Sequence, residues 1–230
     1  MSIEDRHLKI GALIFEGIDQ IDLTGPFEIL SRIPNSSYKI YGLSKAPIRD
    51  TKGLLLTPDD SYDLAPLLDV LHVPGGPGQE ELMSNHSILE FIRRQADHAE
   101  MVFSVCTGAL ILGAAGLLRG KKATTHWSAI ELLPLFGAEV IKKRVVVDGK
   151  FVFAAGVTAG IDGALTVASI LRGEKVAQSI QLAMEYSPEP PFNAGTPETA
   201  PAQILKDVQT GGMELFERRK KTALQFLQKS

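Results

Sequence analysis

Short apolar runs alternate with stretches of helical periodicity through most of the sequence. The apolar runs have the length and composition of buried strands, and they occupy residues 8–15, 38–43, 70–73 and 101–105. Helical spacing of apolar residues follows in the segments 20–33, 87–99, 107–118, 158–171 and 174–186. Strands that alternate with helices predict a mostly parallel sheet with helices on both faces, so the expected fold class is α/β.

Three local signals refine this plan. Pro26 is compatible with a helix only near its start, so we expect that helix to begin near Thr24 with Pro26 in its first turn. Asp148-Gly149 separates the apolar segments 139–147 and 151–154 and predicts a hairpin. The Pro-rich stretch 187–201 precedes an amphipathic helix at about 213–227. We expect one domain over residues 1–230, with 187–230 as an arm that wraps this domain or a partner subunit.

Length and composition exclude several classes of protein. The 230 residues suit a single α/β domain, and 44% hydrophobic residues suffice for a large core. A net charge of −3 argues against nucleic acid as the main partner. A single cysteine cannot form an internal disulfide, which favours a reducing, cytoplasmic setting. Residues 1–7 are too polar for a signal peptide, and the apolar stretches fall short of the roughly 20 residues of a membrane span.

The only cysteine, Cys106, lies where a strand signal meets a helix signal with almost no loop between them. Such a corner strains its residue and projects the side chain above the sheet, as in a nucleophile elbow, and small neighbours at Ser104 and Gly108 give clearance. The following helix directs its free N–H groups at the sulfur, so we expect a lowered thiol pKa. The alternative is that Cys106 is a small buried apolar residue of the core.

Asp22 is the candidate proton donor and acceptor for this cysteine. It follows the first strand, and both residues are expected at the carboxyl ends of the strands, where ligands of such sheets bind. Burial between Ile21 and Leu23 would raise the pKa of Asp22 and let it hold a proton near neutral pH. A helix N-cap carboxylate is the alternative, and spacing alone does not decide between them.

The remaining candidates are weaker. Gly75 and Gly76 follow a strand, and their amides, with that of Thr107, could stabilise a developing negative charge; a plain tight turn is the alternative. Among the five histidines, His126 is the best candidate for the site, although a structural role is favoured. The sequence has no HExxH motif, paired cysteines or GxGxxG motif, so we expect no metal and no nucleotide cofactor.

Several segments together resemble the ThiJ/PfpI superfamily, whose fold is a flavodoxin-like α/β sandwich with an elbow cysteine. They are QIDLTGP at 20–26, VPGGPG at 73–78, SVCTGALILGAAGLL at 104–118, ATTHW at 123–127, TAGID at 158–162 and EYSPEPPFNAGTPETAPA at 185–202. Within the superfamily, QIDLTGP paired with PPFNAG is similar to the isocyanide hydratase group. The protease-like branch has His after the cysteine, where this chain has Thr107. The peroxide-sensing branch uses a Glu near the first strand, whereas Asp22 matches the hydratase pattern here.

This resemblance implies addition of water to an isocyanide, R–N≡C, to give an N-substituted formamide. Cys106 would form a thioimidate, Asp22 would move protons, and Thr107 would hydrogen-bond Asp22 or the sulfur. It implies no metal or organic cofactor, an apolar pocket for the R group, and a homodimer. Two alternatives stay open: a glyoxalase or stress-response enzyme of the same superfamily, and a regulatory module similar to the amidase-like domain of AraC-type regulators. The chain ends too soon to hold the DNA-binding domain of such a regulator.

Overall fold

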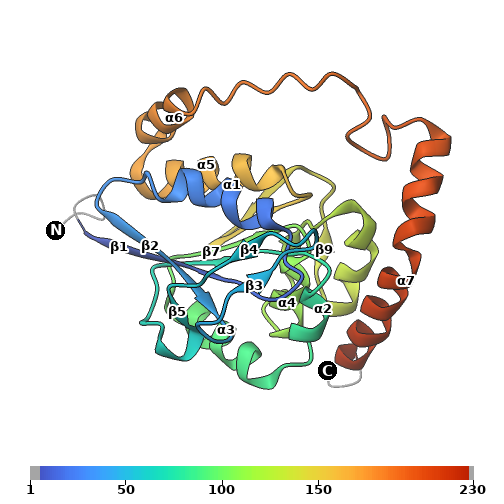
Figure 1. Ribbon diagram of the computed structural model, residues 1–230, viewed down its shortest axis with the longest axis horizontal. Coiled ribbons are helices and arrows are strands. Elements are labelled where there is room, and N and C mark those ends of the chain that lie inside the picture. Colours follow the sequence, from blue (N-terminus) through green and yellow to red (C-terminus); the bar gives the residue numbers. More distant parts are fainter. Residues whose placement is uncertain (1–5, 228–230) are drawn as a thin grey trace.

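A seven-stranded sheet organises the computed structural model, which describes residues 6–227 (Figure 1). The strand order is β10-β11-β7-β6-β1-β2-β5. All neighbours pair in parallel except β10 and β11, which form an antiparallel pair at one edge. The strands are β1 (Leu8–Leu13), β2 (Ser36–Gly42), β5 (Asp60–Ser61), β6 (Val70–Val73), β7 (Met101–Val105), β10 (Val145–Asp148) and β11 (Phe151–Ala154). The predicted α/β class with a mostly parallel sheet is confirmed.

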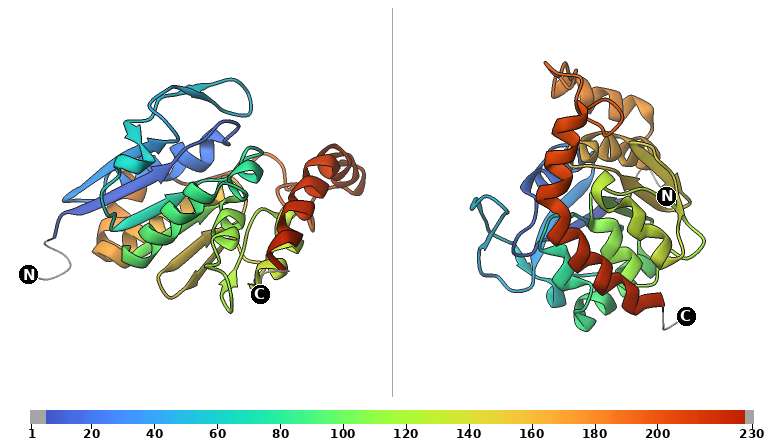
Figure 2. Two further views of the ribbon diagram at one scale, coloured as in Figure 1. Left: turned by 90° about the horizontal axis from the view of Figure 1, so that it is seen from below. Right: turned by 90° about the vertical axis from the view of Figure 1, so that its right-hand side faces the viewer.

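Helices cover both faces of the sheet, as Figures 1 and 2 show. One face is covered by α1 (Gln20–Leu30), α5 (Ala159–Arg172) and α6 (Glu174–Ala183). The other is covered by α2 (Gln79–Leu82), α3 (His86–His98), α4 (Gly108–Ala114) and the 3-10 segment η3 (Trp127–Phe136). Because both faces are covered, β6, β7 and β11 are buried at every residue, which explains their continuous apolar runs.

Short elements lie outside the main sheet. Two small sheets are formed by β3 (Ile48–Arg49) with β4 (Leu55–Leu56) and by β8 (Lys122–Ala123) with β9 (Glu139–Val140), and η2 (Tyr62–Leu64) is a single 3-10 turn. The predicted hairpin is confirmed at β10 and β11. The segment 139–147, however, divides into β9 and β10 rather than forming one long strand.

The first helix begins earlier than predicted. Asp19 caps it, with its side chain accepting a hydrogen bond from the Ile21 amide at 3.2 Å, so helix α1 begins at Gln20 rather than near Thr24. Pro26 consequently lies inside the helix. Having no N–H, it leaves the carbonyl of Asp22, four residues earlier, without its helical donor. The predicted helix 107–118 is also shorter, because Gly116 adopts a left-handed φ of 80° just beyond its end.

The C-terminal segment extends away from α6 and returns to the domain as one long helix. Residues 187–201 have no regular secondary structure and lead from α6 to α7 (Ala202–Leu227), which begins well before the predicted 213. Helix α7 packs against η3 and α2 (Figure 2). None of the helices in residues 6–227 combines the length and the apolarity of a membrane span. The residues on which the signal-peptide prediction chiefly rests, 1–5, lie outside the described part of the chain.

Candidate active site

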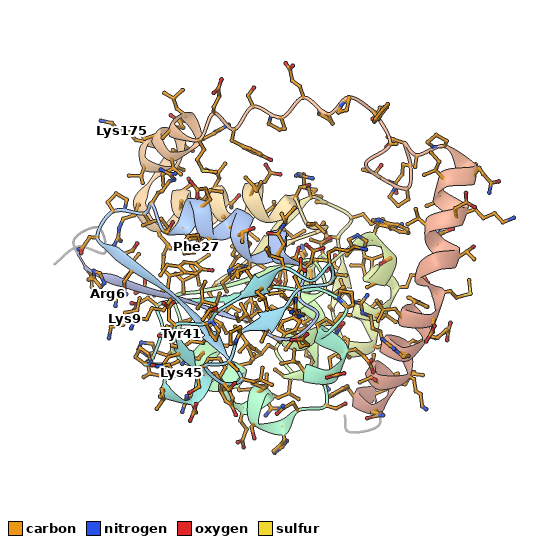
Figure 3. All side chains as sticks on the ribbon, viewed as in Figure 1. Arg6, Lys9, Phe27, Tyr41, Lys45 and Lys175 are labelled. Atoms are coloured by element: carbon orange, nitrogen blue, oxygen red, sulfur yellow. The ribbon has the colours of Figure 1, made fainter. Side chains whose placement is uncertain are left out.

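The loops after β1, β6, β7 and β11 meet at the carboxyl edge of the sheet, the edge nearer to α7. The opposite end of the sheet holds the beginning of β1, where Arg6 and Lys9 lie, far from α7 (Figure 3). Since parallel strands place their carboxyl ends at one edge, the topology brings Asp22, Gly75 and Cys106 together. The candidate site is therefore assembled by segments far apart in the sequence.

Cys106 occupies a strained corner between β7 and α4. Its φ of 55° lies in the left-handed region, which side-chain-bearing residues rarely adopt. Its amide donates to the Ala154 carbonyl at 3.0 Å, and its carbonyl accepts from the Thr125 hydroxyl at 2.6 Å. A Cβ at Gly108 would lie 2.0 Å from the Val73 carbonyl oxygen, so this corner requires glycine there. The strained strand-to-helix elbow predicted at Cys106 is confirmed, whereas its role as a nucleophile stays a prediction.

The electrostatics of the thiol differ from the prediction. Burial raises the pKa of Cys106 well above its ordinary value, and the negative charge of Asp22 adds to this increase. The amides of Thr107 and Val157 and the charge of Arg219 act in the opposite direction. The expected lowering of the thiol pKa was wrong, because loss of hydration outweighs the few N–H groups at the start of a seven-residue helix.

Asp22 is fully buried in the first turn of α1. It is not the helix cap, because Asp19 occupies that position. Asp22 Oδ2 accepts from the Gly75 amide at 3.0 Å, whereas Oδ1 is buried with no hydrogen-bond partner among the described residues. Burial, followed by the charge of Asp19, raises the pKa of Asp22 to about 7, against smaller opposing effects of the Gly75 amide and the Cys106 thiol. A carboxyl with this pKa can both accept and donate a proton near neutral pH.

Gly75 and Gly76 lie against residues 104–108, the cysteine turn, which is the proposed nucleophile turn. A Cβ on Gly75 would lie 2.5 Å from the Thr107 nitrogen, and one on Gly76, with φ of 132°, would lie 2.3 Å from the Asp19 nitrogen. Both amides already have acceptors: that of Gly75 binds Asp22, and that of Gly76 binds the Thr107 hydroxyl at 3.1 Å. Their role in stabilising a substrate's negative charge stays a prediction. In this structure they hold the two neighbouring side chains in place.

The Thr107 hydroxyl bonds with the backbone of Gly76 rather than with Asp22. It accepts from the Gly76 amide and donates to the Gly76 carbonyl at 3.3 Å. Thr107 therefore joins the glycine loop to the cysteine turn, while its own amide lies near the sulfur.

His126 is the N-cap residue of η3 and lies near the same site. Its Nδ1 accepts from the Ser128 amide at 3.3 Å and lies 2.8 Å from the Ser128 hydroxyl. Burial and the charge of Arg219 lower the pKa of His126 to about 4, so the ring is neutral at physiological pH. Because Nδ1 is an acceptor, the neutral ring has its proton on Nε2. The helix-capping bond supports the structural role favoured for His126, and the ring also lines the adjacent cavity.

A cavity of about 610 Å³ lies beside the cysteine turn. Its lining includes Thr125 and Val157, both of which contact Cys106. The Thr125 hydroxyl donates to the Cys106 carbonyl, and the Val157 amide interacts with the Cys106 thiol. Trp127 and Ile130 contribute apolar surface, and residues 195–198 of the arm close one side. The arm therefore forms part of the wall of this cavity, which sequence analysis did not predict.

Arg219 and Gln79 are buried polar residues near the site that sequence analysis missed, as is Thr125 with its hydrogen bond to the Cys106 carbonyl. Arg219 belongs to a run of charged residues on an amphipathic helix, a pattern typical of a solvated face, and Gln79 follows a glycine-rich loop without any motif. Nothing in the sequence distinguished them from surface residues. Among residues 6–227, no group of three His, Cys, Asp or Glu side chains is arranged to hold a metal ion.

Comparison with known proteins adds independent information. The model of the DJ-1/PfpI family matches residues 8–170. An isonitrile hydratase of Pseudomonas putida is 47% identical over 202 residues, 88% of this chain and 89% of that protein. The transcriptional regulator GbdR of Pseudomonas aeruginosa is 28% identical over 181 residues, 75% of this chain but only 49% of the regulator.

The fold comparison agrees with the sequence comparison. The crystal structure of a ThiJ/PfpI family protein from Pseudomonas syringae superposes with a TM-score of 0.92 at 37% identity, covering 94% of this chain and 90% of the other. This protein belongs to the DJ-1/PfpI family.

Proposed function

We propose that this protein is an isocyanide hydratase that converts R–N≡C and water into the N-substituted formamide R–NH–CHO. The observation that supports this most is the pairing of Cys106, at a strained elbow, with the buried carboxyl of Asp22, whose pKa is about 7. The relative named isonitrile hydratase, 47% identical over most of both chains, supports the choice of substrate.

In the first step, Cys106 attacks the terminal carbon of the isocyanide. Asp22 takes the thiol proton and delivers it to that carbon, so that a C–S and a C–H bond form and the product is the thioimidate R–N=CH–S–Cys106. Asp22 suits this shuttle, because its Oδ1 accepts no hydrogen bond of regular geometry from the described residues, while the neighbouring Cys106 thiol acts on the carboxyl by hydrogen bonding. No metal or organic cofactor takes part in this step.

In the second step, water adds across the C=N bond of the thioimidate. Asp22 acts as the base for the water, and the nitrogen receives a proton, which gives R–NH–CH(OH)–S–Cys106. Collapse of this adduct forms the C=O bond and breaks the C–S bond. The hydroxyl proton returns through Asp22 to the sulfur, and the formamide leaves with the enzyme restored.

The cavity beside the cysteine turn would receive the R group. Its apolar part comes from Trp127, Ile130 and Val157, and its volume of about 610 Å³ exceeds that needed for a small cyclic substituent. Cys106 and Asp22 lie behind this lining, both buried, so the reacting carbon would reach them past Val157 and Thr125.

We further propose a cytoplasmic homodimer. Several apolar side chains of α6, the arm and the first half of α7 are exposed in the single chain: Leu182, Phe192, Ile204, Val208 and Met213. Burial of such a set between two chains would remove a substantial apolar surface from water. The free thiol of Cys106 suits a reducing compartment.

The test is turnover of a panel of isocyanides, including cyclohexyl isocyanide, by the wild type and by Cys106→Ala and Asp22→Asn. We expect formamide from the wild type and none above background from Cys106→Ala. Methylglyoxal serves as a comparison substrate, and faster lactate formation than formamide formation would favour the glyoxalase alternative. A gel-shift assay addresses the regulatory alternative, for which the chain corresponds to only about half of GbdR. A purified protein inert toward every isocyanide would contradict the proposal.

A further inference from the structure

The C-terminal helix α7 places a buried cation against the candidate active site. Arg219 is only 6% exposed, although it lies on a helix whose first half faces solvent. Burying a guanidinium costs free energy unless its donors are satisfied and its charge is compensated. Within the described residues, no carboxylate lies within ion-pair distance of Arg219. A charged side chain buried at this cost indicates a role beyond attaching the helix.

The donors of Arg219 are directed at the loops of the site. Its Nε donates to Gln79 Oε1 at 2.7 Å, and its Nη2 donates to the Gly76 carbonyl at 3.0 Å and approaches the Thr107 hydroxyl at 3.4 Å. Gly76 and Thr107 are themselves hydrogen-bonded to each other. The guanidinium therefore joins the loop after β6 to the residue that follows the nucleophile.

We propose that Arg219 is a positioning residue, whose guanidinium fixes the Gly76 carbonyl and the Thr107 hydroxyl and favours negative charge on the Cys106 sulfur over the Asp22 carboxylate. The first part follows from the hydrogen bonds. The second part concerns the proton that Cys106 gives to Asp22. This transfer moves one negative charge from the carboxylate to the sulfur, so a cation that acts on the sulfur favours it.

Arg219 acts electrostatically on the sulfur end of this pair. Its charge lowers the pKa of Cys106, against burial and Asp22, which raise it. Burial lowers the pKa of Arg219 itself, and the Cys106 thiolate and Glu80 oppose that decrease. The other ionisable groups around Arg219 are Arg218 and His126, and His126 is neutral at physiological pH. Arg219 is thus the cation that favours the thiolate.

Neighbouring residues attach α7 to α2 without touching the nucleophile turn. The Thr222 hydroxyl donates to Glu80 Oε1 at 2.8 Å, and Arg218 Nε lies 3.5 Å from Glu80 Oε2 with a side chain 56% exposed. Arg218 is therefore a matched control: it has the same charge, lies on the same helix and contacts α2, but has no direct bond to the nucleophile turn.

The experiment measures the pH dependence of Cys106 alkylation by iodoacetamide and, separately, kcat and KM for cyclohexyl isocyanide. Arg219→Met should lower the alkylation rate at pH 7 about tenfold by raising the apparent thiol pKa about one unit. It should lower kcat by a similar factor with little change in KM. Arg219→Lys, which keeps the charge and loses the planar fork, should retain the wild-type alkylation profile while kcat falls. Arg218→Met should match the wild type in both assays.

The two assays depend differently on the proposed function. Only the kcat and KM measurements require that the protein be an isocyanide hydratase. Alkylation needs no isocyanide, so it tests the charge effect even if the protein is inert toward that substrate. An unchanged alkylation profile in Arg219→Met would overturn the inference. If Arg219→Met fails to fold in a thermal melt, the decision passes to Arg219→Lys, in which kcat equal to the wild type would overturn the positioning role.

Discussion

Replacing Asp22 by Asn should make this protein more stable, and increasingly so at higher pH. Asp22 is fully buried, and in the folded state its pKa is raised from 3.8 to about 7, chiefly by burial. Asn has nearly the same shape, and its carbonyl oxygen can accept the hydrogen bond that Gly75 now donates to Oδ2. It cannot ionise, so it avoids the cost of a buried negative charge.

The magnitude follows from linkage between protonation and folding. Between pH 3.8 and 7, the folded state keeps a proton that the unfolded chain has released, so stability falls as pH rises through this window. The loss is about 1.4 kcal/mol per pH unit, which amounts to about 2 kcal/mol at pH 5 and about 4 kcal/mol above pH 7. The amide introduced by Asp22→Asn also changes the unfolding free energy in ways that do not depend on pH. These contributions cancel when the difference between variant and wild type at one pH is compared with the difference at another.

The assay is thermal unfolding of the wild type and Asp22→Asn at pH 5 and pH 8.5. The stability gained by the variant should be about 3 kcal/mol larger at pH 8.5, a relative shift in Tm of roughly 6–12 °C for a chain of this size. Asp207→Asn, at an exposed carboxylate on α7, should show no such difference. A Tm difference between wild type and Asp22→Asn that is equal at both pH values would refute the raised pKa of Asp22.

Two glycine substitutions compare a tightly packed position in the site with an open position on the C-terminal helix. Gly75→Ala places a methyl group 2.5 Å from the Thr107 nitrogen, so we expect a loss of about 2–3 kcal/mol in chemical denaturation together with loss of turnover. Gly212→Ala, in α7 where nothing outside the local helix lies within 4 Å of the new Cβ in the single chain, should stabilise the helix by about 0.5–1 kcal/mol. A stable, active Gly75→Ala protein would contradict the close contact between the glycine loop and the nucleophile turn.

The sequence predicted the elements whose signals are local. The continuous apolar runs of β6 and β7 and the absence of a loop before α4 were sufficient to predict the parallel sheet and the strained corner at Cys106. The start of α1 was misplaced because the capping side chain of Asp19 prevailed over the preference of Pro26 for a first turn.

What could not be predicted depends on the tertiary structure. The thiol pKa changes direction because burial, which periodicity does not measure, outweighs the N–H groups at the start of α4. The hydrogen bonds of Gly75 and Gly76 to Asp22 and Thr107 require three loops to meet. Arg219 lies 113 positions after Cys106 in a charged run, so only the docking of α7 reveals its role.

The central claim is that Cys106 bonds covalently to the isocyanide carbon, and intact-protein mass spectrometry of rapidly quenched reactions tests it most directly. During turnover of cyclohexyl isocyanide, we expect a species heavier than the enzyme by the mass of one substrate molecule, located by peptide mapping on Cys106 and absent from Cys106→Ala. Formamide production by Cys106→Ala, or wild-type turnover with the adduct located on any other residue, would contradict the account.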